Sequence, residues 1–165
     1  MGNRMRTPKI YLETTIFNFP FVDDAPDLRD YTLQLFEDIK AGKFIPYTSG
    51  YVVEELEKTQ NIEKRNKMIA LIADYGIKVM PANKKAEWLA SVYVKEGIIK
   101  AKYESDALHI AMATIANLDF IISLNFQHIV KHKTIFETEV VNTREGFKRV
   151  FIYTPMEVIG YDKDA

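Results

Sequence analysis

The sequence contains no cysteine, which excludes disulfide bonds, cysteine-ligated zinc sites and thiol chemistry. Glycine and proline are scarce, with 7 and 6 residues in a chain of 165, so collagen-like and low-complexity structures are excluded as well. No apolar run is long enough to span a bilayer. The net charge is only −1, so any binding of nucleic acid must use a local basic patch.

The first eight residues are basic, but no apolar segment follows them, which is unlike a secretory signal peptide. Together with the absence of cysteine, this predicts a cytoplasmic protein that does not associate with membranes. The composition, 47% hydrophobic and 27% charged, is typical of a globular protein. We expect a single domain over residues 1–165, in which residues 1–8 form a flexible lead.

Buried-strand and amphipathic-helix patterns alternate along the chain. The strands are expected over residues 9–13, 44–48, 77–80, 120–122 and 148–153. Helices are expected over residues 26–41, 49–59, 62–75, 83–94 and 106–115, with a loop over 14–24 and a short helix over 126–131. Such alternation predicts an α/β fold with a parallel sheet and right-handed crossovers, and a last turn opens at Pro155.

Residues 102–126 are the most informative stretch. One helix face carries the apolar repeat Ala107, Leu108, Ala111, Met112 and Ile115. Asp106 stands at the start of this helix, and Asn125 follows the next strand. In an open α/β sheet, the carboxyl ends of strands and the neighbouring helix starts form the ligand-binding crevice, so these two side chains are expected to meet there.

Other acidic residues occupy equivalent places. Glu13 ends the first strand, and Glu54 and Glu55 follow the second. At about 100° per residue, Glu55 borders the buried face of its helix and Glu54 faces solvent. These acids converge only if the first and fourth strands are neighbours, as in a doubly wound five-stranded sheet of order 3-2-1-4-5.

Gathered carboxylates repel one another unless a cation neutralises them. Hard oxygen ligands without cysteine favour Mg²⁺ or Mn²⁺, which can activate water and clamp a phosphate group. The sequence contains no nucleophile elbow, metalloprotease motif or P-loop that would indicate different chemistry.

Each candidate also has a purely structural interpretation. Asp106 could favour the helix dipole or cap the helix, and Asn125 could cap a short helix. Asp119 precedes the fourth strand at its far end, where a turn acid is expected, and His109 is expected to be structural or exposed. Several lysines could contact phosphates near the cleft or simply be solvated: Lys100, Lys102 and Lys131.

Four segments together resemble the PIN domain, and more narrowly the VapC-like ribonucleases of toxin–antitoxin pairs. They are Tyr-Leu-Glu-Thr-Thr-Ile-Phe at 11–17, Thr-Ser-Gly-Tyr-Val-Val-Glu-Glu-Leu at 48–56, and Ser-Asp-Ala-Leu-His-Ile-Ala-Met-Ala at 105–113 followed by Ile-Ser-Leu-Asn-Phe at 122–126. The resemblance covers residues 8 to 155 approximately. It implies a 3-2-1-4-5 sheet, an Mg²⁺ or Mn²⁺ site, cleavage of single-stranded RNA, a homodimer, and a cognate antitoxin that blocks the cleft.

The resemblance also assigns roles to individual residues. Asp106 takes the place of the strongest metal ligand, and Glu55 that of the acid before leucine. Thr15 takes the place of a small hydroxyl residue. Glu13 stands where the family usually has aspartate, one methylene shorter. Asn125 stands at a fourth polar position that is often aspartate. Three carboxylates remain, which favours one ion over two.

The sequence therefore predicts a metal-dependent endoribonuclease of the toxin type. The alternative is a catalytically weak or inactive PIN-fold module that binds RNA or protein, which the departures at Glu13 and Asn125 favour. A phospho-acceptor receiver domain fits poorly, because that chemistry needs an acidic pair after the first strand and an acceptor aspartate after the third.

Overall fold

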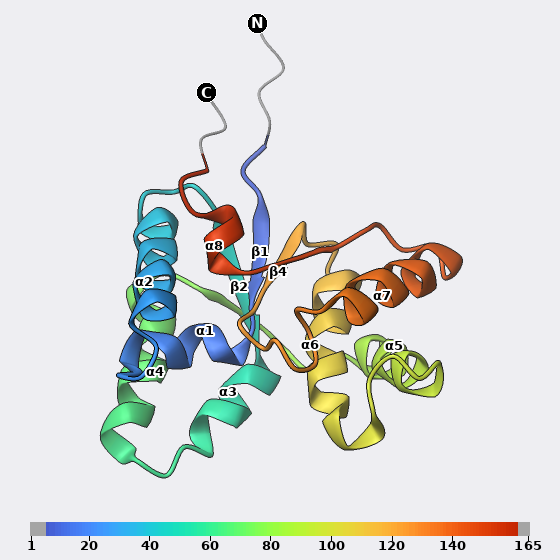
Figure 1. The fold of residues 1–165 in the computed structure, drawn as a ribbon, viewed down its shortest axis with the longest axis horizontal. Helices are drawn as coiled ribbons and strands as arrows, with labels where there is room; N and C mark the ends of the chain where they lie inside the picture. The colour runs from blue at the N-terminus through green and yellow to red at the C-terminus, as the bar shows by residue number, and fades with distance from the viewer. Residues whose placement is uncertain (1–5, 162–165) are drawn as a thin grey trace, which may run out of the picture.

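Five parallel strands form one sheet at the centre of the molecule, in the order β3-β2-β1-β4-β5 (Figure 1). The computed structural model describes residues 6–161. The strands are β1 (Lys9–Leu12), β2 (Ile45–Ser49), β3 (Lys78–Met80), β4 (Phe120–Ile122) and β5 (Phe151–Tyr153). The α/β class and the strand order predicted from the sequence are confirmed. Because β1 lies between β2 and β4, the chain changes direction at this strand.

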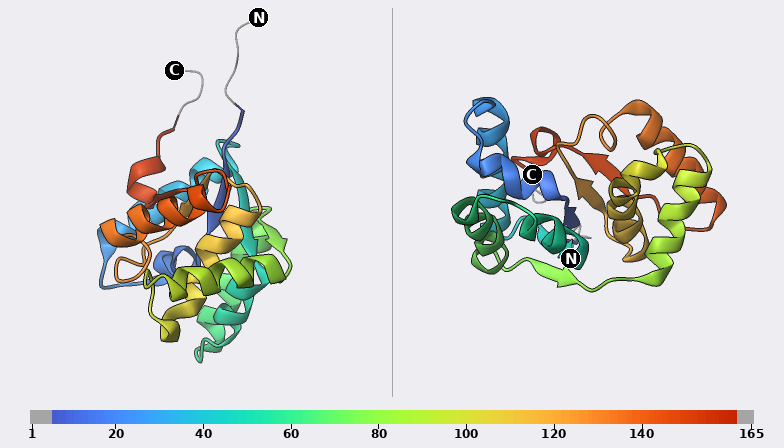
Figure 2. Two further views of the ribbon diagram at one scale, coloured as in Figure 1. Left: turned by 90° about the vertical axis from the view of Figure 1, so that its right-hand side faces the viewer. Right: turned by 90° about the horizontal axis from the view of Figure 1, so that it is seen from below.

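Helices cover both faces of the sheet. Seen from below in Figure 2, one side carries α1 to α4 and the other carries α5 to α7, while α8 lies beside α2. The helices are α1 (Thr14–Asn18), α2 (Pro26–Lys40), α3 (Gly50–Glu57), α4 (Ile62–Asp74), α5 (Lys84–Lys95), α6 (Glu104–Ile115), α7 (His132–Arg144) and α8 (Pro155–Val158), with 3₁₀ turns η1 (Phe19–Phe21) and η2 (Ala101–Tyr103). Among residues 6–161, no helix is long and apolar enough to cross a membrane.

The core is built around the central strand. Ile10, Tyr11 and Leu12 of β1 have no exposed surface, and neither do Ile121 and Ile122 of β4, which pair with them in register. A strand that is buried on both faces needs such a continuous apolar run. The apolar run ends where β1 ends, so the polar residues that follow it lie at the carboxyl edge of the sheet.

Two predicted helix starts are confirmed by their caps. The Ser49 side chain accepts a hydrogen bond from the Val52 backbone N–H at the start of α3, and Asn83 does the same for Ala86 at the start of α5. Such caps satisfy backbone donors that a helix leaves unpaired. They fix where α3 begins relative to β2, and therefore where Glu55 lies.

Several local expectations were wrong. Residues 14–24 are not simply a loop but contain α1 and η1, and residues 126–131 form turns instead of a helix. Helix α7 was not predicted at all. Its buried side chains are mainly polar, so the apolar periodicity that indicates a helix is missing: Thr134, Thr138, Val141 and Asn142.

The expected flexible lead is partly fixed. Residues 1–5 lie outside the described part of the chain. The Arg6 guanidinium, however, donates to both carboxylate oxygens of Asp119, and the Pro8 carbonyl accepts from the Ile45 backbone N–H at 2.9 Å. Asp119 also accepts from the Lys9 backbone N–H and from Lys148. This ion-pair cluster lies at the amino edge of the sheet, opposite the predicted site.

Candidate active site

Polar residues that follow β1 and β4 meet at the carboxyl edge of the sheet. The Glu13 backbone N–H donates to the Ile122 carbonyl at 3.1 Å, which extends the pairing of the two strands by one residue. Glu13 and Ser123 therefore emerge side by side. Their meeting point is the position at which the chain changes direction, where open α/β sheets place their ligands.

Glu13 is held by two hydroxyl groups. Its side chain is buried, and its Oε1 accepts hydrogen bonds from Thr15 Oγ1 and Ser123 Oγ, both at 2.6 Å. Burial raises the pKa of Glu13. The charge of His109 and the two hydrogen bonds lower this pKa, but by less than burial raises it. Thr15 in turn accepts the Leu124 backbone N–H at 2.8 Å. Thr15 thus fixes both the carboxylate and the segment after β4.

Asp106 lies in the first turn of α6, but it does not cap that helix. The N-cap residue is Tyr103, which makes no side-chain capping bond. Asp106 is half-buried, and burial raises its pKa, against a hydrogen bond from the Asn125 side chain that lowers it. The Asn125 Oδ1 accepts the His128 backbone N–H at 3.0 Å. Asn125 therefore stabilises the turn after β4, where no helix forms for it to cap, and lies near Asp106.

Glu55 bonds to a histidine that the sequence did not mark as functional. The His109 Nε2 lies 2.6 Å from Glu55 Oε1, and its Nδ1 lies 2.7 Å from the Tyr11 hydroxyl. That hydroxyl is also 2.7 Å from Ser49 Oγ. His109 has no exposed surface. A chain of side chains therefore links the end of β2, the central strand, α6 and α3.

The charges of these hydrogen-bonded side chains affect one another's pKa values. Burial alone would lower the pKa of His109, but the hydrogen bond and charge of Glu55 outweigh burial and raise it. Burial would raise the pKa of Glu55, and the bond and charge of His109 outweigh it and lower that pKa. Glu55 also lies near enough to Glu13 and Asp106 that its charge raises the pKa of both. One acid thus bonds to the buried imidazole, and the other two act on it through their charge.

One signal in the sequence could have identified His109. It stands three residues after Asp106, and residues at this spacing share a helix face. A histidine on the site-facing side of α6 could therefore have been expected near the acids. A single histidine among apolar neighbours is more often structural, and its partners Tyr11 and Glu55 are 98 and 54 residues away in sequence.

The donor atoms fit a divalent ion in kind but are not arranged as a ready site. Carboxylate oxygens suit Mg²⁺ or Mn²⁺. In the part of the chain that the structure describes, however, no three acids or histidines are placed to hold an ion together. Oε1 of Glu13 accepts two hydroxyls, and Oε1 of Glu55 is bonded to His109. An ion bound by all three acids would have to use the other carboxylate oxygens, Oε2 of Glu13 and Oε2 of Glu55, or displace these bonds.

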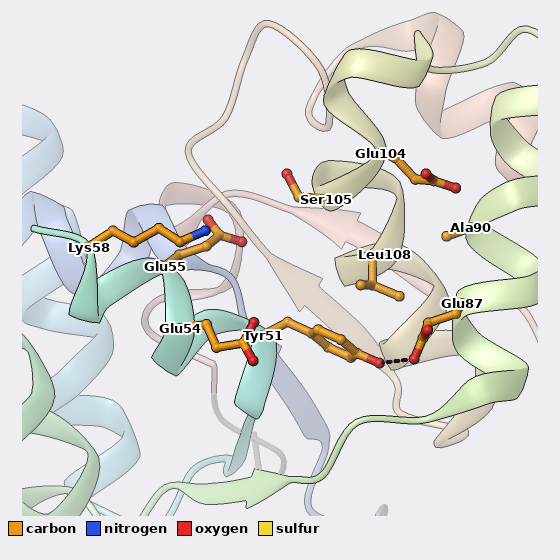
Figure 3. Close-up of a pocket in the computed structure, with 9 residues that line it drawn as sticks. All are labelled: Tyr51, Glu54, Glu55, Lys58, Glu87, Ala90, Glu104, Ser105 and Leu108. Carbon is orange, nitrogen blue, oxygen red and sulfur yellow. Dashed lines mark hydrogen bonds between the residues drawn. The ribbon is translucent and has the colours of Figure 1, made fainter.

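A groove of about 400 Å³ lies beside Glu55, between α3 on one side and α5 and α6 on the other (Figure 3). Four glutamates line it: Glu54, Glu55, Glu87 and Glu104. The Tyr51 hydroxyl donates to Glu87 Oε2 at 2.7 Å across the groove, and Lys58 points toward Glu55. Glu54 is exposed and Glu55 is half-buried, as the helical angles predicted.

The predicted lysines lie on the other side of the α6 start. Lys131 and Lys100 line a second groove of about 410 Å³. The Lys102 ammonium lies 5.0 Å from the ring centroid of Tyr103, which lines the same groove. The structure therefore brings the secondary candidates Lys102 and Lys131 to one side of the acids and Thr15 into direct contact with Glu13.

Two solved toxin structures share this fold. VapBC2 from Rickettsia felis, solved bound to a DNA fragment from its promoter, aligns with a TM-score of 0.54 and 14% identity over 88% of this chain and 98% of that chain. VapC20 of Mycobacterium tuberculosis, a toxin that cleaves the sarcin-ricin loop, gives a TM-score of 0.51 and 13% identity over 84% and 96%. No family model matches the sequence, and no curated protein matches it significantly. The PIN-like, VapC-type fold predicted from the motifs is confirmed.

Proposed function

We propose that this chain is a metal-dependent endoribonuclease that cleaves single-stranded RNA and acts as the toxin of a type II toxin–antitoxin pair. One observation carries the proposal: at the carboxyl edge of the sheet, Glu55 of α3 bonds to His109, and acids from the end of β1 and the start of α6 lie near enough to act on the same imidazole by their charge. The VapC-type fold supports the same reaction class, because both solved neighbours are named as VapC toxins or their complexes.

In this proposal Glu13, Glu55 and Asp106 hold a single Mg²⁺ or Mn²⁺ ion. When bound, the ion supplies positive charge against the phosphodiester and acidifies a water molecule. Thr15 and Ser123 orient the Glu13 carboxylate through their hydroxyls.

The remaining polar groups prepare the other two acids. Asn125 orients Asp106 through its side-chain amide, a positioning role. His109 keeps Glu55 ionised, because the hydrogen bond and the positive charge of the imidazole lower the pKa of that carboxyl group. Glu55 is therefore available as an anionic ligand near neutral pH.

The partners follow from the same comparison. A cognate antitoxin is proposed because the Rickettsia felis neighbour is a VapBC complex. A homodimer in the cytoplasm is proposed with it. The antitoxin would cover the cleft beside Glu55, where four glutamates suit a basic segment of a partner.

A second candidate function is a PIN-fold module that binds RNA or protein without turnover. It is favoured by the bond between Glu55 and His109, and by the lack, within residues 6–161, of three acids or histidines placed to hold an ion. The longer Glu13 and the uncharged Asn125 point the same way, since each departs from the usual aspartate.

Titration with Mn²⁺ or Mg²⁺ separates the two candidates. Two quantities are measured at increasing ion concentrations: the melting temperature of the purified chain, and its cleavage of labelled single-stranded RNA. The nuclease should gain thermal stability and begin to cleave over the same concentration range, because both follow occupancy of one site. If millimolar ion produces neither stabilisation nor cleavage, the nuclease proposal is contradicted and the binding module remains.

A further inference from the structure

The start of α6 divides two grooves of opposite charge. Glu104 and Ser105 line the acidic groove, whereas the preceding residue, Tyr103, lines the groove that contains Lys100 and Lys131. No acidic residue is among those that line this second groove in the described chain. The phosphate backbone of a nucleic acid is repelled by the first groove and attracted by the second, so the second is the electrostatically favoured path.

The basic groove lies close to Asp106, to which it is linked through Asn125. His128 lines it, and its backbone N–H donates to the Asn125 side chain that contacts Asp106. The His128 side chain is near enough that its charge lowers the pKa of Asp106. A nucleotide bound in this groove would therefore lie next to the nucleotide that is bound at the acidic residues.

The groove contains an aromatic pair. The rings of Tyr103 and His128 are stacked, with centroids 3.9 Å apart and planes inclined by 26°. Tyr103 comes from η2 and His128 from the turn after β4, and both are only half-buried. Nucleobases stack on such partly exposed rings in proteins that bind single strands, largely independently of sequence.

Three lysines around the pair are not neutralised. Lys100, Lys102 and Lys131 are exposed, and none forms a salt bridge with an acid in residues 6–161. Lys133, by contrast, donates to the Gly97 and Ile98 carbonyls and pairs with Glu137, so it is part of the groove wall. The ammonium groups of Lys100 and Lys131 can meet phosphates on either side of a stacked base, whereas that of Lys102 lies over the Tyr103 ring.

We propose that this groove is a substrate subsite, in which the Tyr103–His128 pair stacks one base of a single-stranded RNA next to the cleaved position. Lys100 and Lys131 bind the flanking phosphates. The RNA then reaches the acids from the basic side, and the glutamate groove remains free of it. The substrate class rests on the proposed function, but binding in the groove does not require turnover.

The test measures binding without metal, so that cleavage cannot intervene. Fluorescence anisotropy in EDTA would follow labelled homopolymeric RNA of about a dozen nucleotides, a length that fills such sites. Tyr103→Ala should weaken binding about tenfold or more, and Tyr103→Phe should bind like the wild type because the ring is kept. Tyr31→Ala, which removes an exposed tyrosine from α2, is the matched control and should have no effect.

The lysines are tested by salt dependence. The double variant Lys100→Ala/Lys131→Ala should reduce the slope of log affinity against log salt by about 1.4, since each neutralised phosphate on a single strand contributes about 0.7. Lys40→Ala, which removes an exposed lysine from the end of α2, should leave the slope unchanged. Melting curves establish that each variant is folded.

The outcomes separate the subsite from the enzyme. The subsite is overturned if the wild type does not bind the RNA detectably, or if Tyr103→Ala binds it with the same affinity as the wild type. If the wild type binds with the expected variant pattern but never cleaves RNA, the subsite stands and the nuclease proposal fails. If the wild type cleaves, Tyr103→Ala should raise KM and leave kcat near its wild-type value. A lowered kcat at unchanged KM would mean that Tyr103 only fixes the start of α6, which also overturns the subsite.

Discussion

Two aspartates flank β4 at opposite edges of the sheet, and replacing each with asparagine should have opposite effects. Asp106→Asn should abolish RNA cleavage and the response to Mn²⁺ while leaving the fold stable. Asp119→Asn should destabilise the fold while leaving cleavage intact. Both changes keep the side-chain shape and remove one charge, so each variant is the control for the other.

The stability change at Asp106 should be small. Its interaction with the dipole of α6 contributes about 0.3–1 kcal/mol, which the variant loses. Burial raises the pKa of Asp106, so removing the charge also relieves an unfavourable burial, and the two effects oppose each other. The net change should stay below about 1 kcal/mol, or a melting shift within about 4 °C for a chain of this size.

The stability change at Asp119 should be larger. Its carboxylate binds Arg6, Lys148 and the Lys9 backbone N–H. Burial alone would raise its pKa, but these bonds outweigh burial and hold that pKa well below its ordinary value. Because Arg6 and Lys148 are largely exposed, their attraction is weakened by solvent. We expect a loss of about 1–2 kcal/mol and a melting temperature lower by about 2–8 °C.

The assay combines melting curves, in EDTA and in saturating Mn²⁺, with cleavage of a labelled single strand. An ion present at about 100 times its Kd stabilises the wild type by about 2.7 kcal/mol, which raises its melting temperature by roughly 5–11 °C. Asp119→Asn should keep this increase and Asp106→Asn should lose it. Cleavage that survives Asp106→Asn, or that disappears in a folded Asp119→Asn protein, would refute the assignment of the site.

Three further predictions concern the interior of the site. Glu13→Asp moves the carboxylate back by one methylene toward the usual family residue and should keep or raise kcat; a loss of both kcat and Mn²⁺ stabilisation would contradict the idea that aspartate restores the usual geometry at this position. Because burial raises the pKa of Glu13, the folded chain holds this proton more tightly, and stability falls as pH rises from the ordinary glutamate value through the raised one. The stability of Glu13→Gln relative to the wild type should therefore increase as the pH rises above the ordinary glutamate value of about 4, in urea titrations with EDTA, whereas a difference that does not change with pH would contradict this. His109→Leu should lower the free energy of unfolding by about 1.5–3 kcal/mol through loss of the bond to Glu55, and a wild-type urea midpoint would show that the bond contributes little.

The sheet could be predicted from the sequence because its strands are short apolar runs between polar ends. The run Phe120–Ile122 identified β4, and the caps at Ser49 and Asn83 located two helices. Helix α7 could not be found in this way, because Thr134 and Thr138 face inward while Phe136 is 68% exposed. Polar packing replaces the apolar stripe on which the prediction depends.

The site was predicted in part for a related reason. Strand ends and helix starts are visible in a sequence, so Glu13, Asp106 and Asn125 could be placed at one edge. The bond between His109 and Glu55 was not visible, because it joins two helices whose relative orientation is set by packing. The approach of Asn125 to Asp106 was expected from the same rule, although it is made through a turn after β4, where a helix was expected.

The hydroxyls that hold Glu13 also tie down the backbone beyond β4. Thr15 Oγ1 accepts the Leu124 N–H, and Ser123 Oγ accepts the Asn125 N–H at 3.0 Å. A change in the hydrogen bonding of the Glu13 carboxylate is thus transmitted directly to two amide protons. Residue-resolved hydrogen–deuterium exchange of the Leu124 and Asn125 amides should therefore detect occupancy of the site, even when no substrate is cleaved.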